Sequence, residues 1–330
     1  KDGVEVDFAR GYVGDVTGAY NGVTTGQNLE DKRSEAELIA EAVEKAKAAD
    51  CVILFGGLNK SDYQDCEGHD RQQYELPYAQ DKLITALAAA NKNFVYVNIS
   101  GNAVAMPWHD KVPAIVQGWY LGSEAGEALA SVLTGDANPS GKLPFTWVKS
   151  LQNVGAHALN TYPGTWRKEG GSKTEGNIID EEYKEGIYVG YRWADRKKQR
   201  PVFAFGHGLS YTQFAISNLR ADKASMTAAD SITFTVQVKN IGQRAGSETV
   251  QLYVHDAKAS VDRPLKELKG FCKVSLKPGE SKDVSITLGK DALSFYDETT
   301  ASWKAEPGQF EAWVGNASDN LKLRKSFQLK

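Results

Sequence analysis

The sequence predicts an α/β domain with a mainly parallel sheet, followed by a small all-β sandwich. Two patterns in the 330-residue chain indicate this organisation. In the first part, apolar runs of strand length alternate with segments of helical periodicity, which favours parallel strands covered by helices on both faces. After about residue 215, apolar and polar residues alternate with period two, which is typical of antiparallel sheets. We therefore expect domains at residues 1–215 and 216–330.

The elements of the first domain follow from local periodicity. Alternating residues at 4–9 predict a strand near the start of the chain, and the apolar residues of 34–49 recur at helical spacing, with Ser34 or Asp31 as the cap. An apolar strand at 51–55 then leads through two glycines into a long polar loop that ends near residue 77. The remaining predicted elements are a helix at 78–91, strands at 94–99 and 114–119, and a helix at 123–133.

The second domain shows the regular alternation of an immunoglobulin-like sandwich. Its predicted strands lie at 232–238, 249–254, 282–288 and 309–314. Turn signals separate them, such as the Pro278-Gly279 pair.

Composition and motifs exclude several classes of function. The net charge of -3, without a cluster of basic residues among aromatics, argues against a nucleic-acid partner. No apolar stretch is long enough to span a membrane, and no glycine-rich nucleotide loop follows a strand. The cysteines Cys51, Cys66 and Cys272 are too few for a disulfide framework. Cys66 and His69 lack further metal ligands nearby, so we expect neither a metal nor a cofactor.

The polar loop after the 51–55 strand is the strongest functional signal. Ligands of open α/β sheets bind at the carboxyl ends of the strands, where this loop begins. Glu67 has no basic neighbour, and a partner surface that excluded water would keep such a carboxyl protonated near neutral pH. Asp65 is the competing acid, and Tyr63 and Asp65 are weak candidates for substrate binding. From the residues alone, a solvated surface glutamate is the more common explanation of Glu67.

Several motifs along the chain resemble the C-terminal portion of a glycoside hydrolase family 3 β-glucosidase. They are the sequence Glu67-Gly68-His69-Asp70-Arg71, the turn cluster at 135–144, the Phe-Gly-His-Gly-Leu-Ser-Tyr segment at 205–211 and the sandwich segment at 263–271. The resemblance implies an α/β sandwich domain followed by a fibronectin type III-like domain. It also implies that Glu67 is the general acid/base of a retaining, exo-acting enzyme, and that Gly57 and Gly68 let its loop reach across to a partner.

In that family the nucleophile is an aspartate on an N-terminal barrel of about 250 residues. We therefore expect the chain to be a C-terminal part whose opening strand is missing, inactive alone and paired with a complementary barrel polypeptide or domain. The expected substrate is a β-gluco-oligosaccharide, and the expected location is periplasmic or secreted in a bacterium, with a homodimer as one possible assembly. The alternatives are a β-xylosidase of the same family and a non-catalytic carbohydrate-binding or scaffold fragment.

Overall fold

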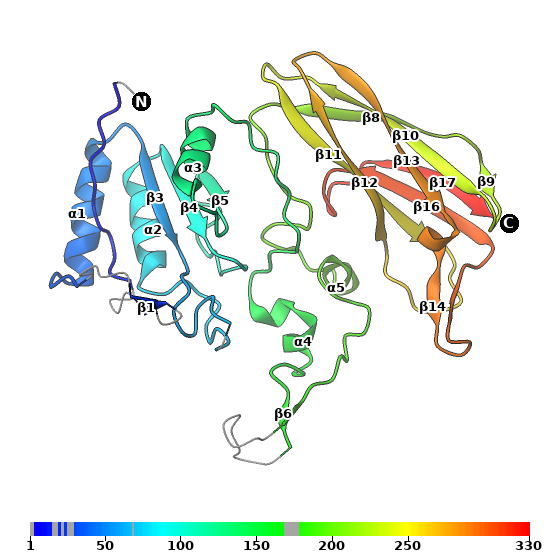
Figure 1. Ribbon diagram of the computed structural model, residues 1–330, viewed down its shortest axis with the longest axis horizontal. Helices are drawn as coiled ribbons and strands as arrows, with labels where there is room; N and C mark the ends of the chain where they lie inside the picture. The colour runs from blue at the N-terminus through cyan, green and yellow to red at the C-terminus, as the bar shows by residue number, and fades with distance from the viewer. Residues whose placement is uncertain (1–2, 15–18, 21–22, 25–29, 68, 168–177) are drawn as a thin grey trace. The chain divides into compact units, whose positions relative to one another are not determined.

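The computed structural model describes residues 3–14, 19–20, 23–24, 30–67, 69–167 and 178–330 (Figure 1). The chain forms two compact units, Lys1–Leu129 and Ala130–Lys330. The first holds the parallel sheet and the second holds the sandwich, which confirms the predicted fold class.

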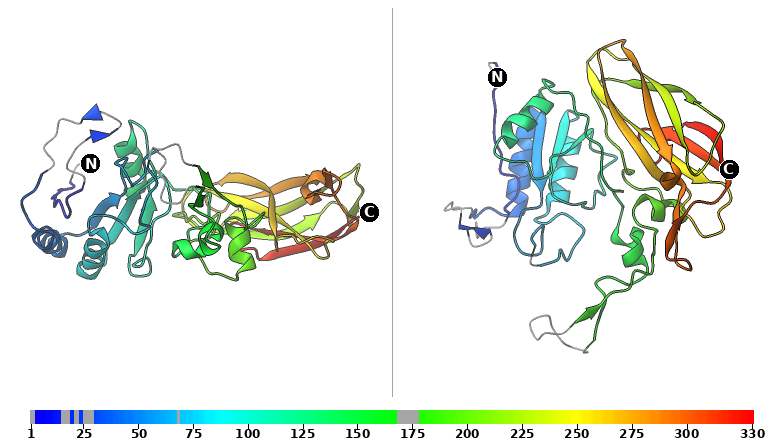
Figure 2. Two further views of the ribbon diagram at one scale, coloured as in Figure 1. Left: turned by 90° about the horizontal axis from the view of Figure 1, so that it is seen from below. Right: turned by 45° about the vertical axis from the view of Figure 1, so that its right-hand side comes forward.

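The first unit is built on a three-stranded parallel sheet in the order β3-β4-β5. Its strands are β3 (Val52–Gly57), β4 (Phe94–Ile99) and β5 (Ala114–Gln117). The helices are α1 (Glu35–Ala48) and α2 (Gln80–Ala90), and α3 (Ala125–Leu133) spans the boundary between the units. The strands β1 (Ala19–Tyr20) and β2 (Val23–Thr24) pair antiparallel. Figure 2 shows α1 and α2 side by side along one face of the sheet.

Local sequence explains where α1 begins. The Ser34 backbone N–H donates to the Glu37 carboxylate at 2.7 Å, and the Glu37 N–H donates to the Ser34 hydroxyl at 3.3 Å. This reciprocal capping box selects Ser34 rather than Asp31 as the cap. The helix then buries Leu38, Ala42 and Ala46, the helical stripe that the sequence predicts.

Two predictions for this unit are wrong. Residues 4–9 form no strand, and Val6 and Phe8 in this run are 84% and 76% exposed. Alternation alone does not make a strand, because its backbone groups need a neighbouring strand for hydrogen bonding. The prediction that helices cover both faces of the parallel sheet also fails in part among the described residues. Ile53 and Phe55 on β3 are 44% and 51% exposed, and α3 buries none of its residues.

The sandwich packs two layers, of order β13-β10-β8 and β12-β11-β16-β17-β9, whose strands pair antiparallel except for the parallel pair of β17 and β9. The four predicted strands are present as β10 (Ser231–Asn240), β11 (Gly246–Asp256), β13 (Ser281–Gly289) and β16 (Gly308–Gly315). Further elements are β8 (Phe214–Ala221), β9 (Ser225–Met226), β12 (Glu267–Leu276), a 3-10 turn (Lys290–Leu293), β14 (Phe295–Asp297), β15 (Ser302–Lys304) and β17 (Leu323–Leu329). Alternate residues of the facing strands, among them Phe234, Leu252 and Phe310, form its core.

Residues 130–213 lie in the same compact unit as the sandwich. They contain a 3-10 turn (Leu151–Asn153), α4 (Gly155–Ala158), β6 (Thr165–Trp166), β7 (Ile179–Asp180) and α5 (Tyr191–Arg196). The Tyr191 hydroxyl accepts a 2.9 Å hydrogen bond from the Leu268 N–H, and Lys266 pairs with Asp195. These contacts explain the grouping with the sandwich, while the domain boundary at 215/216 stays a prediction.

Candidate active site

The loop that follows β3 is closed at its base by a buried glutamine. Gln80, at the start of α2, accepts a 2.7 Å hydrogen bond from the Gly57 N–H and donates one of 2.8 Å to the Gly57 carbonyl. Gly57 has φ +126°, and a Cβ placed there would lie 2.1 Å from the Ile99 carbonyl oxygen. Only glycine fits this position, so the strand turns into the loop at a fixed point.

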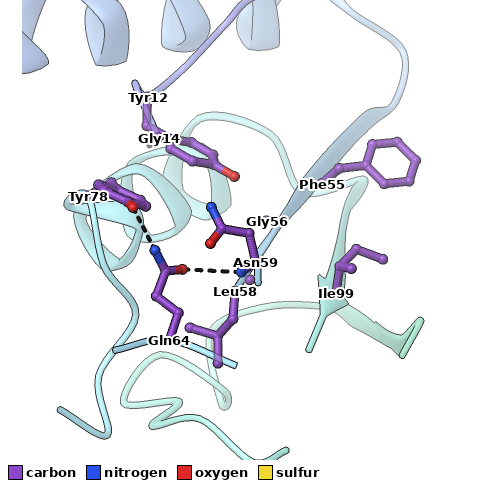
Figure 3. A pocket seen from close by; sticks show the side chains of 10 residues that line it. Tyr12, Gly14, Phe55, Gly56, Leu58, Asn59, Gln64, Tyr78 and Ile99 are labelled. Carbon is purple, nitrogen blue, oxygen red and sulfur yellow. Dashed lines mark hydrogen bonds between the residues drawn. The ribbon is translucent and has the colours of Figure 1, made fainter. Parts of the chain in front are cut away.

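The first turn of the loop is held by its own polar groups. The Ser61 N–H donates to the Asn59 side chain at 2.8 Å, and the Asp65 N–H donates to the Asn59 carbonyl at 3.0 Å. Gln64 accepts from the Asn59 N–H at 3.1 Å and donates to the Tyr78 hydroxyl at 2.6 Å (Figure 3). The turn is therefore connected both to the end of β3 and to the segment that enters α2.

Asp65 connects the loop to the ends of the two other strands. Its carboxylate oxygen accepts hydrogen bonds from the Gly101 N–H at 2.7 Å, after β4, and from the Tyr120 hydroxyl at 2.9 Å, after β5. Burial and this bond to Asp65 raise the pKa of Tyr120, so its hydroxyl stays a donor. Asp65 thus acts as an anchor in this geometry, which favours Glu67 over Asp65 as the acid.

Arg71 braces the far side of the loop. The sequence predicts that it pairs with Asp70 or a neighbouring acid; its guanidinium donates to the Ala103 carbonyl at 2.6 Å. Burial lowers the pKa of Arg71, and the charge of Asp65 opposes that shift. Arg71 is thus a structural residue of the loop, as expected, but its hydrogen-bond partner is a backbone carbonyl beyond β4.

Glu67 itself is exposed and has no hydrogen bond or ion pair with any described residue. Gly68, whose freedom we expected to extend the loop, lies outside the described residues. Tyr63 is also exposed and packs its ring on His69 at 4.9 Å, so it is close to the Glu67 segment in space as well as in sequence. The braced loop therefore presents to the solvent a carboxyl group that no described residue binds.

A pocket of about 200 Å³ lies at the carboxyl end of β3 (Figure 3). The rings of Tyr12 and Tyr78 are nearly parallel at 6.4 Å on one side of it, and Asn59 and Gln64 of the loop line another side. Burial raises the pKa of Tyr12. Sequence reasoning missed Tyr12, because nothing in the irregular run before α1 indicates that it reaches the end of β3. The volume is below that of pockets for drug-sized ligands, so it suits a small group.

A carboxyl that is free, exposed and carried on a fixed loop is suited to exchanging protons with a group that arrives from outside. Together with the parallel sheet and the sandwich, this loop agrees with the class that the motifs indicate, the C-terminal portion of a glycoside hydrolase. The comparisons with known proteins identify which one. Residues 7–191 match the glycosyl hydrolase family 3 C-terminal domain, and residues 248–318 match the fibronectin type III-like domain. The chain belongs to glycoside hydrolase family 3, and the resemblance that the motifs indicate is confirmed.

The relatives are β-glucosidases. β-Glucosidase BoGH3A of Bacteroides ovatus is 45% identical over 335 residues, which cover 99% of this chain and 43% of that protein. Thermostable β-glucosidase B of Acetivibrio thermocellus is 42% identical over 304 residues, which cover 92% of this chain and 38% of that protein. β-Glucosidase B of the fungus Emericella nidulans is also similar, so bacterial origin stays a prediction.

Solved structures agree with these relatives. The β-glucosidase of Kluyveromyces marxianus in complex with glucose aligns with a TM-score of 0.79 at 38% identity, covering 91% of this chain and 34% of that chain. The GH3 β-glucosidase of Bifidobacterium adolescentis aligns with a TM-score of 0.80 at 35% identity, covering 91% and 42%. The chain thus spans less than half the length of these proteins. In the parts that the structure describes, no helix has the length and apolar character needed to cross a bilayer.

Proposed function

We propose that the chain is the C-terminal part of a retaining, exo-acting β-glucosidase and supplies its general acid/base, Glu67. The observation that carries the proposal is the exposed Glu67 carboxyl, unpaired among the described residues, on a loop that Gln80, Asp65 and Arg71 hold at the edge of the parallel sheet. The relatives named β-glucosidases support a β-glucoside rather than a β-xyloside as the substrate.

Retaining glycosidases place two carboxyl groups about 5 Å apart. Glu67 would protonate the leaving oxygen in the first step and accept a proton from water in the second, while a carboxylate of the partner barrel attacks the anomeric carbon. Proton transfer of this kind contributes about 100- to 10,000-fold to the rate. A solvated carboxyl is a poor acid for this task, and an opposing barrel surface would remove water from Glu67 and keep it protonated.

The uncovered apolar surface supports a complementary N-terminal partner. Ile53 and Phe55 on β3 and the helix α3 leave apolar groups exposed, and surfaces of this kind are normally covered by another part of a protein. The chain alone should therefore hydrolyse neither aryl β-glucosides nor aryl β-xylosides, and should self-associate. A monodisperse monomer with ordinary activity would overturn this part of the proposal. Secretion or a periplasmic location, bacterial origin and a homodimer of the complete enzyme are further expectations of the same proposal.

The test of Glu67 is a substitution in the complete enzyme. Glu67→Gln should slow glycosides with poor leaving groups most, because they need protonation, and aryl glycosides with activated leaving groups least in the first step. External azide should restore part of the turnover, since it attacks the glycosyl-enzyme without a base. Glu75→Gln is the matched control, because Glu75 is an exposed glutamate on the same loop. Equal losses on all substrates with no azide rescue would remove Glu67 from this role.

A further inference from the structure

Three potential metal ligands meet on the loop beside Glu67. The donor atoms of Asp62, Cys66 and His69 all lie within 4.8 Å of one another. The His69 Nδ1 is 3.3 Å from the Asp62 carboxylate, and the Cys66 Sγ is 3.1 Å from the His69 carbonyl oxygen. The sequence suggested no third ligand for Cys66 and His69, because a carboxylate four residues before a cysteine carries no ligand signal of its own. The folded turn supplies it.

We propose that Asp62, Cys66 and His69 form a binding site for a zinc-type divalent cation. A thiolate, an imidazole and a carboxylate are the ligand types that zinc accepts, and the thiolate disfavours Mg²⁺ and Ca²⁺. In a tetrahedral zinc site with bonds of about 2.0 to 2.3 Å, neighbouring ligand atoms lie roughly 3.3 to 3.7 Å apart. The Asp62–His69 pair already has this separation, and the sulfur needs to approach by about 1 Å at most.

The surroundings keep these ligands together without preventing that approach. The Tyr63 ring packs on the His69 ring at 4.9 Å and limits its orientation. The turn that carries Asp62 is held by the bonds from Ser61 and Asp65 to Asn59. The Asp62 and His69 side chains are 72% and 50% exposed, so they can rotate toward an ion at little cost in packing. With three protein ligands, the fourth position stays open to water.

The site has a consequence for hydrolysis, and this part rests on the proposed function. Cys66 and His69 flank Glu67 in the sequence, so an ion that joins their side chains would fix the segment between them. A loop fixed in this way cannot adjust the Glu67 carboxyl to the leaving oxygen in the first step and to water in the second. Zinc would therefore act as a reversible inhibitor of the complete enzyme.

The binding test uses the 330-residue chain and Zn²⁺ alone, followed by calorimetry, with Co²⁺ as a spectroscopic substitute. We expect one ion per chain and a thiolate-to-cobalt charge-transfer band. Cys66→Ser should remove the band and weaken Zn²⁺ binding by at least about 10- to 100-fold, a loss that even outer-sphere changes produce. Cys51→Ser and Cys272→Ser, the matched controls, should bind like the unchanged chain. No binding at a large excess of Zn²⁺, or binding that survives Cys66→Ser, would overturn the site.

Two further measurements separate this site from the role of Glu67. Glu67→Gln should bind Zn²⁺ as tightly as the unchanged chain, because Glu67 is not a ligand. In the complete enzyme, Zn²⁺ should inhibit hydrolysis, a chelator should reverse the inhibition, and Cys66→Ser should lower the sensitivity to Zn²⁺ relative to its own metal-free rate. Equal zinc sensitivity of the Cys66→Ser enzyme would refute the inhibitory role, whatever the outcome for Glu67→Gln.

Discussion

Replacing Asp65 with alanine should loosen the loop that carries Glu67 while leaving the parallel sheet folded. The substitution removes two hydrogen bonds to a carboxylate, from the Gly101 N–H at 2.7 Å and from the Tyr120 hydroxyl at 2.9 Å. Bonds to charged groups contribute about 1.5 to 3 kcal/mol each, and partial exposure places these at the low end. We expect a loss of about 2 to 3 kcal/mol in the free energy that holds the loop closed.

Amide hydrogen exchange measures the free energy that holds the loop closed. A loss of that size increases the open population of the loop about 30- to 150-fold, and the exchange rate of the Gly101 amide should rise by the same factor. In the complete enzyme, hydrolysis should slow because Glu67 is held less well. Tyr120→Phe should have a smaller effect, and the double variant should lose less than the sum, since both changes break the same bond.

The matched control is Asp62→Ala, which removes an exposed aspartate of the same loop whose 3.3 Å contact with His69 lies at the surface and contributes little. It should leave the exchange of the Gly101 amide unchanged. If Asp65→Ala also leaves that exchange unchanged, or if Asp62→Ala accelerates it equally, the anchor role of Asp65 is wrong.

Three further predictions concern the stability of the chain. Gly57→Ala should destabilise the first unit by at least about 3 kcal/mol in denaturant unfolding, because φ is +126° and the added Cβ would meet the Ile99 carbonyl oxygen. Gly126→Ala in α3 is the control. It should be neutral or stabilising, because open space surrounds Gly126 and alanine favours a helix. Arg263→Ala should cost about 3 kcal/mol, because it leaves the buried Asp256 carboxylate without this cation, although Glu267 keeps its pairs with Arg192 and Lys269. Arg220→Ala removes an exposed pair and should cost at most about 1 kcal/mol, so similar losses for the two arginines would contradict this. Burial lowers the pKa of His207 below its ordinary value of about 6.5, so the unfolded chain binds a proton more readily than the folded chain does. The free energy of unfolding therefore falls as the pH drops below about 6.5. His207→Gln should flatten the resulting decline in melting temperature between about pH 7 and about pH 5. An unchanged decline would show that other groups cause it.

The motif around Glu67 and the periodicity of the chain determine the family, the fold class and most elements without any knowledge of tertiary contacts. The helical stripe of α1 and the alternating strands of the sandwich are local patterns, because each residue's burial follows from its place in a single element. The position of the loop at the end of β3 followed in the same way, from an apolar run that ends in two glycines.

Contacts between distant segments were decided only by the tertiary structure. The sequence placed Asp65 among the candidate acids, but the order β3-β4-β5 brings Gly101 and Tyr120 to its carboxylate, from positions 36 and 55 residues away. The hydrogen bond from Arg71 to the Ala103 carbonyl likewise joins segments that are distant in the sequence. The approach of Asp62, Cys66 and His69 to one another depends on how a single turn folds. Residues 4–9 show the converse, since their alternation predicts a strand that has no partner. Periodicity reports which side of an element is buried, whereas the neighbour on that side is set by how the strands are ordered and where their loops end.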